Sequence, residues 1–198
     1  MKVSRQSFAW PARSTVFESL LARLDRVLTG AGIPYMVIGG QAVLVYGEPR
    51  LTRDVDLTLG IGPDELGRVL EVCREAGLAV LVEDPDGFAR ETMVLPAQEP
   101  ESGIRVDFIF SITGYERQAI ERSRPVALGG AEVRFASLED LVIHKLVAGR
   151  PRDIEDARLI LARNPGYDRQ YIEHWLGEFS RVLACDLGRV LADITGSV

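Results

Sequence analysis

The chain has 198 residues, 46% of them hydrophobic, and a formal net charge of −6 at pH 7. This composition is that of an ordinary globular protein and excludes a disordered or membrane-spanning one. The acidic balance argues against a protein that coats nucleic acid through its overall charge, although a local basic groove is compatible with it. The N-terminal residues lack the apolar core of a signal peptide, so we expect a cytoplasmic protein.

Lysine is rare in this chain, because arginine carries nearly all of the positive charge. Lysine occurs only at Lys2 and Lys145, so the internal Lys145 stands out as a candidate functional residue. The two cysteines, Cys73 and Cys185, are too few and too far apart to predict a disulfide framework or a metal site. We therefore expect reduced thiols.

The first two thirds of the chain mix predicted strands and helices. A capping-box sequence at Thr15 opens the first helix, and the pair Gly39 and Gly40 separates the first strand from the second helix. In chain order we expect helices over 15–28, 41–46, 63–76 and 115–122, and strands over 35–38, 54–59, 78–82, 92–95, 104–110, 125–128 and 132–135. We expect a turn over 83–87 and an exposed loop over 96–103.

The last third of the chain is almost entirely helical in pattern. It begins at Ser137 and is broken at 149–151 and 164–166. Strands and helices followed by helices alone predict an α+β (mixed α/β) fold. We expect a core over 1–136 and a C-terminal helical region over 137–198 packed on it.

The histidines and the C-terminal aromatic residues are predicted to be structural. Trp175 and Phe179 are four apart on one helical face, where packing explains them better than base stacking. His144 and His174 have no nucleophile or metal ligand at a suggestive spacing, so we expect them to be structural or solvated.

Three aspartates carry the strongest chemical signal. Asp54 and Asp56 are two apart on a predicted strand, so their side chains share one face and repel each other. Magnesium relieves such repulsion, because it prefers oxygen ligands, and phosphoryl-transfer enzymes often hold two such ions about 4 Å apart. Asp107 interrupts the apolar strand over 104–110 and is the natural third carboxylate. The alternative for Asp107 is an ion pair with Arg105 or another arginine.

The glycine pair supplies a candidate phosphate site. Gly39 and Gly40 follow a strand and precede a helix, so the backbone can approach phosphate oxygens closely. The helix N-terminus then offers free N–H groups and a favourable dipole. A plain tight turn is the usual explanation of such a pair, but its order and spacing relative to the aspartates make the combination more specific.

These residues together resemble a known group of enzymes. The glycine pair, then Arg50-Leu-Thr-Arg-Asp-Val-Asp-Leu57, then Asp107 on a later strand resemble the DNA polymerase β-like nucleotidyltransferase superfamily. Within it the sequence is most similar to the minimal and AbiEii-type bacterial nucleotidyltransferases, several of which act as toxins in toxin–antitoxin pairs. The resemblance covers roughly residues 35–156.

The resemblance implies a nucleotidyltransferase-like mixed sheet flanked by helices, with a C-terminal helical bundle. It implies that Asp54, Asp56 and Asp107 bind magnesium as a triad, and that Gly39 and Gly40 hold the triphosphate. Many members have serine at the second glycine position, where its hydroxyl reaches a phosphate. Here that residue has only its backbone N–H to offer.

A later segment, residues 141–156, also resembles the AbiEii-type proteins. There a helix lysine and a following Arg-Asp-x-x-Asp element face the nucleotide site, which implies that Lys145 meets the triphosphate. Asp153 would orient Lys145 or act on the acceptor; the alternative is that it caps the helix begun at Pro151 and pairs with nearby arginines.

Arg50 and Arg53 lie just before Asp54 and the predicted metal-binding strand in the sequence. Either could contact phosphate as part of the nucleotide site. The alternative is that both simply balance the charge of Asp54 and Asp56.

The expected function is magnesium-dependent transfer of a nucleoside monophosphate from an NTP to an acceptor hydroxyl. The acceptor could be tRNA, a protein side chain or a small molecule, and a toxin would have an antitoxin protein as partner. One alternative is kinase-like transfer of the γ-phosphate from the same metal site. The other is a catalytically silent nucleotide-binding or regulatory module.

Overall fold

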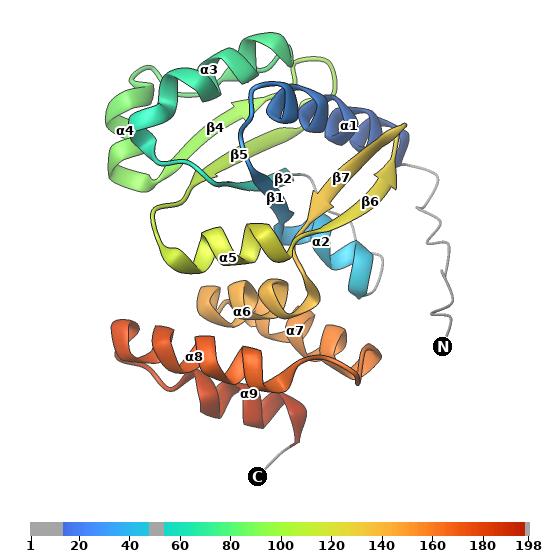
Figure 1. Ribbon diagram of the computed structural model, residues 1–198, viewed down its shortest axis with the longest axis vertical. Coiled ribbons are helices and arrows are strands. Elements are labelled where there is room, and N and C mark those ends of the chain that lie inside the picture. Colours follow the sequence, from blue (N-terminus) through green and yellow to red (C-terminus); the bar gives the residue numbers. More distant parts are fainter. Residues whose placement is uncertain (1–13, 48–53, 197–198) are drawn as a thin grey trace.

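The computed structural model describes residues 14–47 and 54–196 of the chain (Figure 1). Within these ranges one mixed sheet has the strand order β3-β4-β5-β2-β1-β7-β6. Its strands are β1 (Tyr35–Ile38), β2 (Asp54–Leu59), β3 (Ala79–Val80), β4 (Val94–Gln98), β5 (Arg105–Phe110), β6 (Arg124–Leu128) and β7 (Ala131–Phe135). The mixed α/β fold expected from the sequence is confirmed.

Helices surround this sheet and continue beyond it as a stack. They are α1 (Ser14–Gly30), α2 (Gly39–Tyr46), α3 (Leu66–Glu75) with a preceding 3₁₀ turn (Pro63–Glu65), α4 (Pro85–Thr92), α5 (Gly114–Arg122), α6 (Leu138–Ala148), α7 (Pro151–Arg163), α8 (Arg169–Leu183) and α9 (Leu187–Thr195). Helix α1 packs against β6, β7 and α3, whereas α2 packs against β1, β2, α6 and α7. Figure 1 shows α6 to α9 stacked below the sheet.

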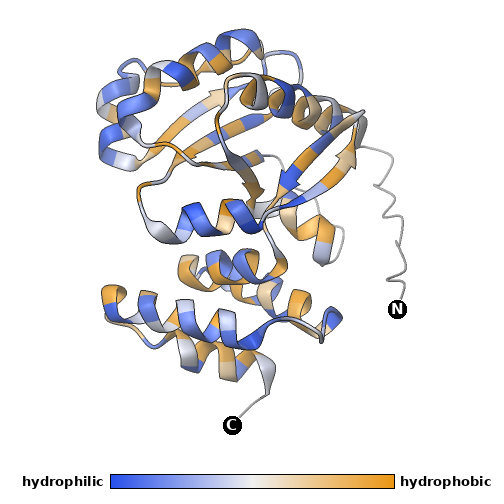
Figure 2. Cartoon of the chain, viewed as in Figure 1, coloured by the Kyte–Doolittle hydropathy of each residue, from blue (hydrophilic) through white to orange (hydrophobic). Residues whose placement is uncertain are grey.

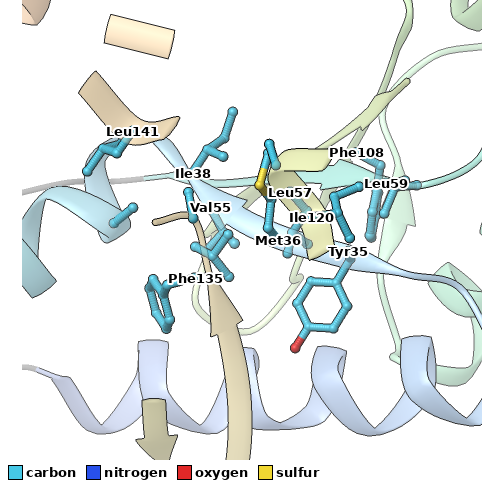
Figure 3. Close-up of a cluster of buried hydrophobic side chains, with 14 of the residues drawn as sticks. Tyr35, Met36, Ile38, Val55, Leu57, Leu59, Phe108, Ile120, Phe135 and Leu141 are labelled. Carbon is cyan, nitrogen blue, oxygen red and sulfur yellow. The ribbon is translucent and has the colours of Figure 1, made fainter. Parts of the chain in front are cut away.

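The central strand β2 has one apolar face and one polar face. Val55, Leu57 and Leu59 are fully buried and lie in the main core, among the side chains drawn in Figure 3. The alternate residues of a strand point the other way, so Asp54 and Asp56 lie on the opposite face. Burial of the apolar face therefore fixes the direction in which both carboxylates point.

The helices after the sheet complete the same core. Four apolar residues of α6 are fully buried in it: Leu141, Val142, Ile143 and Leu146. The outer helices α3 and α8 carry both hydrophilic and hydrophobic residues in Figure 2, as expected of helices with one face in solvent. The predicted division between residues 136 and 137 stays a prediction.

Two local predictions are wrong. The predicted turn over 83–87 contains the start of α4, because Asp84 accepts a hydrogen bond from the Gly87 N–H at 3.1 Å and caps a helix that has Pro85 in its first turn. The predicted loop over 96–103 begins inside β4, which runs to Gln98.

Pro96 lies within β4 although it has no N–H to donate to a neighbouring strand. Pro96 lies opposite Asp107 of β5, and its carbonyl accepts a hydrogen bond from the Leu81 N–H at 2.9 Å. The next residue, Ala97, is fully buried. The sequence cue for a loop was therefore outweighed by burial in the sheet.

The C-terminal aromatic residues pack as predicted. The Tyr115 ring of α5 lies 4.9 Å from the Trp175 ring and 5.0 Å from the Phe179 ring, measured between centroids. Both cysteines are free thiols, as expected. In the described part of the chain, no helix is both long and apolar enough to cross a membrane.

Candidate active site

The three predicted aspartates lie together on two adjacent strands. Strands β2 and β5 are parallel, and their register places Asp56 opposite Asp107 and Asp54 opposite Arg105. Residues directly opposite each other in a sheet share a face, and so do residues two apart along a strand. All three carboxylates therefore belong to one face of the sheet, at the exposed N-terminal end of β2.

Asp56 is the most perturbed of these carboxylates. Partial burial, and then the nearby charges of Asp54 and Asp107, raise its pKa to about 6. Lys145 and Arg150 act in the opposite direction but do not cancel the effect. The face thus concentrates negative charge around a half-buried carboxylate, which is an environment that a bound cation would stabilise.

Gly39 brings the start of α2 against Asp56. Its φ is +64°, and a Cβ atom built at this position would lie 1.9 Å from Oδ2 of Asp56. Glycine is therefore required both by the backbone conformation and by the close approach. The N-cap residue, Ile38, makes no side-chain capping bond to the first turn of α2. The helix dipole and the amides of that turn consequently lie beside the aspartate cluster.

Lys145 is buried, and its ammonium forms ion pairs with two carboxylates. Its ammonium lies 2.6 Å from Oδ1 of Asp153 and 2.9 Å from Oδ2 of Asp156, and all three side chains are at most 8% exposed. Asp153 also accepts a hydrogen bond from Arg150 at the N-cap of α7. Asp153 thus contacts Lys145 and pairs with an arginine, whereas among the described residues no side chain caps the start of α7.

Arg150 is a residue of this region that the sequence did not single out. Its side chain is 76% exposed, and its pKa is raised first by Asp153 and then by the charges of Asp56 and Asp54. An arginine immediately before Pro151, where a helix begins, was the only available sequence signal. Its closeness to the aspartates depends on how α7 packs on the sheet, which spacing does not reveal.

The remaining predicted site residues are Gly40, Arg50 and Arg53. Gly40 follows Gly39 in the first turn of α2 and is buried. Arg50 and Arg53 lie outside the described residues, so their predicted contacts with phosphate stay predictions.

The donor chemistry of the cluster fits a divalent metal. Carboxylate oxygens are the ligands that magnesium prefers, and after burial the charges of Asp54 and Asp107 are the causes that raise the pKa of Asp56. Among the described residues, however, no group of three or more acidic, histidine or cysteine side chains is arranged to hold a metal ion as it stands. Asp107 is instead turned to Arg105, whose Nε donates to its two carboxylate oxygens at 2.8 and 3.0 Å.

Asp54 is the exposed member of the aspartate cluster. Arg105, opposite it on β5, is exposed as well. Two cavities elsewhere have volumes of about 520 and 280 Å³; the first lies between α1 and the β4–β5 connection, and the second lies among α2, β6 and the ends of α6 and α7. The carboxylate of Asp54 is therefore accessible to solvent.

Comparison with protein families decides the assignment. Residues 20–184 match the family described as "Nucleotidyl transferase AbiEii toxin, Type IV TA system". The chain belongs to this AbiEii family. The resemblance inferred from the glycine pair and the aspartates is therefore confirmed, and the protein is a nucleotidyltransferase. Comparison with curated proteins finds no match.

Solved structures of other nucleotidyltransferases share the fold. The solution structure of the antibiotic-resistance factor ANT(2″)-Ia is similar with a TM-score of 0.59 and 18% identity, over 86% of this AbiEii-family chain and 95% of that chain. The crystal structure of an antigenic nucleotidyltransferase-like protein from Paracoccidioides brasiliensis gives a TM-score of 0.53 at 16% identity, over 88% and 91% of the two chains. At these identities the likeness concerns the fold.

Proposed function

We propose that this AbiEii-family protein transfers a nucleoside monophosphate from an NTP to an acceptor hydroxyl, using magnesium held by Asp54, Asp56 and Asp107. The observation that carries the proposal is the β2–β5 register, which puts Asp56 directly opposite Asp107 with the N-terminus of α2 beside them. An anionic triphosphate and its cations need this combination of carboxylates and a helix N-terminus.

The N-terminus of α2 is the proposed triphosphate site. Its first-turn amides would donate to phosphate oxygens, and the missing side chain of Gly39 keeps Asp56 within reach of the same phosphates. Gly40 would contribute its backbone N–H alone. The exposed guanidinium of Arg150 can leave Asp153 and contact the outer phosphates, because its side chain is free of packing on most of its surface.

In this proposal Lys145 is a fixed positive charge rather than a mobile phosphate ligand. Its ammonium is fixed between Asp153 and Asp156, and its charge favours the ionised form of Asp56. It therefore acts as a positioning charge behind the site. A direct contact with the triphosphate stays a prediction.

The chemistry proceeds by in-line displacement at the α-phosphate. The acceptor hydroxyl gives up its proton as it attacks, Asp107 is the proposed group that assists this, and pyrophosphate leaves. Magnesium bound by the three carboxylates would neutralise the triphosphate and polarise the reacting oxygens, and two ions are expected. The α2 amides and Arg150 hold the leaving pyrophosphate in line.

The acceptor and the partners belong to the proposal as well. The family description supports a toxin with an antitoxin partner, and the acceptor is proposed to be tRNA, a protein side chain or a small molecule. ANT(2″)-Ia, similar in fold at 17% identity, has been crystallised with adenylyl-2″-tobramycin, which makes a small-molecule acceptor worth including in the assay. We propose that the protein acts in the cytoplasm.

Transfer of label distinguishes this function from its alternatives. The protein is incubated with magnesium, NTPs labelled at the α- or the γ-phosphate, and cell RNA, protein extract or aminoglycosides as acceptors. Asp54→Asn serves as the control, because it removes a ligand charge at an exposed position where the fold does not depend on it.

We expect α-label to enter one acceptor pool with the wild-type protein and not with Asp54→Asn. Transfer of γ-label alone would replace the proposal with a kinase-like reaction. NTP binding without transfer of either label would support the silent nucleotide-binding module.

A further inference from the structure

One basic residue lies within the aspartate cluster itself. Arg105 precedes Asp107 by two residues on β5, so both side chains share the face that carries Asp54 and Asp56. The Arg105 Nε donates to both oxygens of Asp107, at 2.8 and 3.0 Å. The Asp107 side chain is 19% exposed and that of Arg105 is 53% exposed. The guanidinium thus occupies the edge of Asp107 that a cation would use.

This ion pair explains why the three carboxylates do not form a ready metal site. The backbone register already places Asp107 opposite Asp56, so the strands need no rearrangement. In the described part of the chain, however, no three acidic, histidine or cysteine side chains are placed to hold a metal ion together. Asp107 is turned along its own strand to Arg105 rather than across to β2.

We propose that Arg105 is an internal counter-ion that holds Asp107 away from the metal, and that a divalent cation must displace it in order to bind. The inference rests on the proposed function, because it assigns a competitor to the same metal site. The step is an exchange of non-covalent partners. Asp107 loses the N–H bonds from Arg105 and gains the metal, and the guanidinium is taken up by water.

The geometry allows this exchange. Ion pairs with an exposed partner are weak, since water competes for both charges, so displacement of the guanidinium is inexpensive. The Arg105 side chain has room to leave, because about half of its surface is already in solvent. Once displaced, its positive charge remains near the metal and opposes binding further. Arg105 therefore lowers the affinity of the site for the metal in two ways.

Manganese titration of the full-length protein without nucleotide tests the proposal, with free Mn²⁺ followed by electron paramagnetic resonance. Arg105→Gln should bind Mn²⁺ about three- to fivefold more tightly than wild type, the range expected for a half-exposed ion pair. Arg90→Gln is the matched control, because Arg90 forms a similar exposed pair with Asp86 on α4, at 2.9 Å. It should leave the affinity unchanged. Equal or weaker binding by Arg105→Gln would overturn the proposal.

A second pair of variants separates displacement from a general effect of charge. In the Asp107→Asn background, Arg105→Gln should bring a smaller gain in Mn²⁺ affinity, because the competed carboxylate is gone and only the repulsion by the guanidinium charge remains. An undiminished gain there would overturn the proposal.

The same titration distinguishes this inference from the proposed function. If Asp54→Asn and Asp107→Asn bind Mn²⁺ as tightly as wild type, the metal site itself is wrong, and both fail. If α-label transfer is intact but Arg105→Gln gains nothing, only the role of Arg105 is wrong.

Discussion

Gly39 lies so close to Asp56 that no room is left for a side chain at this position. Gly39→Ala would place a methyl group against Oδ2 of Asp56 and strain the backbone at a φ of +64°. The left-handed conformation alone costs an L-residue about 1–2 kcal/mol. Displacement of the carboxylate should also lower turnover about a hundredfold, as misplacements of this size do.

Thermal unfolding and the α-label assay measure the two effects. Gly177→Ala in α8 is the control, because a methyl group there meets nothing within 4 Å. It should stabilise the protein by about 0.5–1 kcal/mol and leave turnover unchanged. Normal turnover in Gly39→Ala would contradict the close approach of α2 to the catalytic carboxylates.

Asp56 makes the stability of the metal-free protein depend on pH. Its pKa is about 6 in the folded protein, raised by burial and by the neighbouring carboxylates from an ordinary value of 3.8. The folded state therefore holds the proton more tightly than the unfolded state. As pH rises from about 4 to about 6, ionisation of Asp56 removes stability, and this loss persists at higher pH.

Asp56→Asn should accordingly be more stable than wild type at pH 7.5, by about 1–3 kcal/mol. The difference should disappear near pH 4, where the wild-type carboxyl is largely protonated. Urea unfolding in the presence of a chelator measures both. An Asp56→Asn variant that is less stable than wild type at pH 7.5 would show that the carboxylate has a compensating partner.

Helices α6 and α7 are joined by the buried cluster of Lys145, Asp153 and Asp156. Lys145→Met would leave two carboxylates without their shared cation, at sites where each side chain is at most 8% exposed. Removing one partner of such a cluster costs about 3–5 kcal/mol. Chemical denaturation should show this loss.

Arg158→Met is the control for this variant. Arg158 pairs with Glu155 on the exposed side of α7, where an ion pair is worth about 1 kcal/mol or less. Equal stability of the two variants would mean that Lys145 is not the cation that holds the two helices together.

At the scale of elements, the sequence predicts best where one strong pattern acts alone. The alternation of apolar and polar residues identified β2, and the glycine pair located the start of α2. The sequence-based prediction was wrong where two cues competed. Pro85 and Gly87 are typical of a turn, yet Asp84 caps a helix there. Pro96 resembles a loop residue, yet the sheet buries it within β4. Local residue types do not reveal which segments the core will cover.

At the scale of the molecule, the site combines parts that are distant in the sequence. The sheet contributes the aspartates, while α6 and the start of α7 contribute Lys145 and Arg150 from residues that come about 40 positions after Asp107 in the chain. The aspartates were predictable because strand periodicity aligns their side chains. The position of Arg150 was not predictable, because it depends on packing. For Asp107 the sequence left two kinds of partner open, a metal or an arginine such as Arg105, and it could not decide between them.

The family match covers both the sheet and the helices that form the site. A match over residues 20–184 spans both the sheet and the helices α6 to α8, so the family signature includes the parts that supply the two positive charges.

A crystal structure with Mn²⁺ and a non-hydrolysable NTP analogue tests the central claim most directly, because anomalous scattering locates the metal. The account predicts a metal peak within ligand distance of Asp54, Asp56 and Asp107, with the triphosphate at the N-terminus of α2. It also predicts that Arg105 has left Asp107. A nucleotide bound elsewhere, or metal peaks away from the three carboxylates, would contradict it.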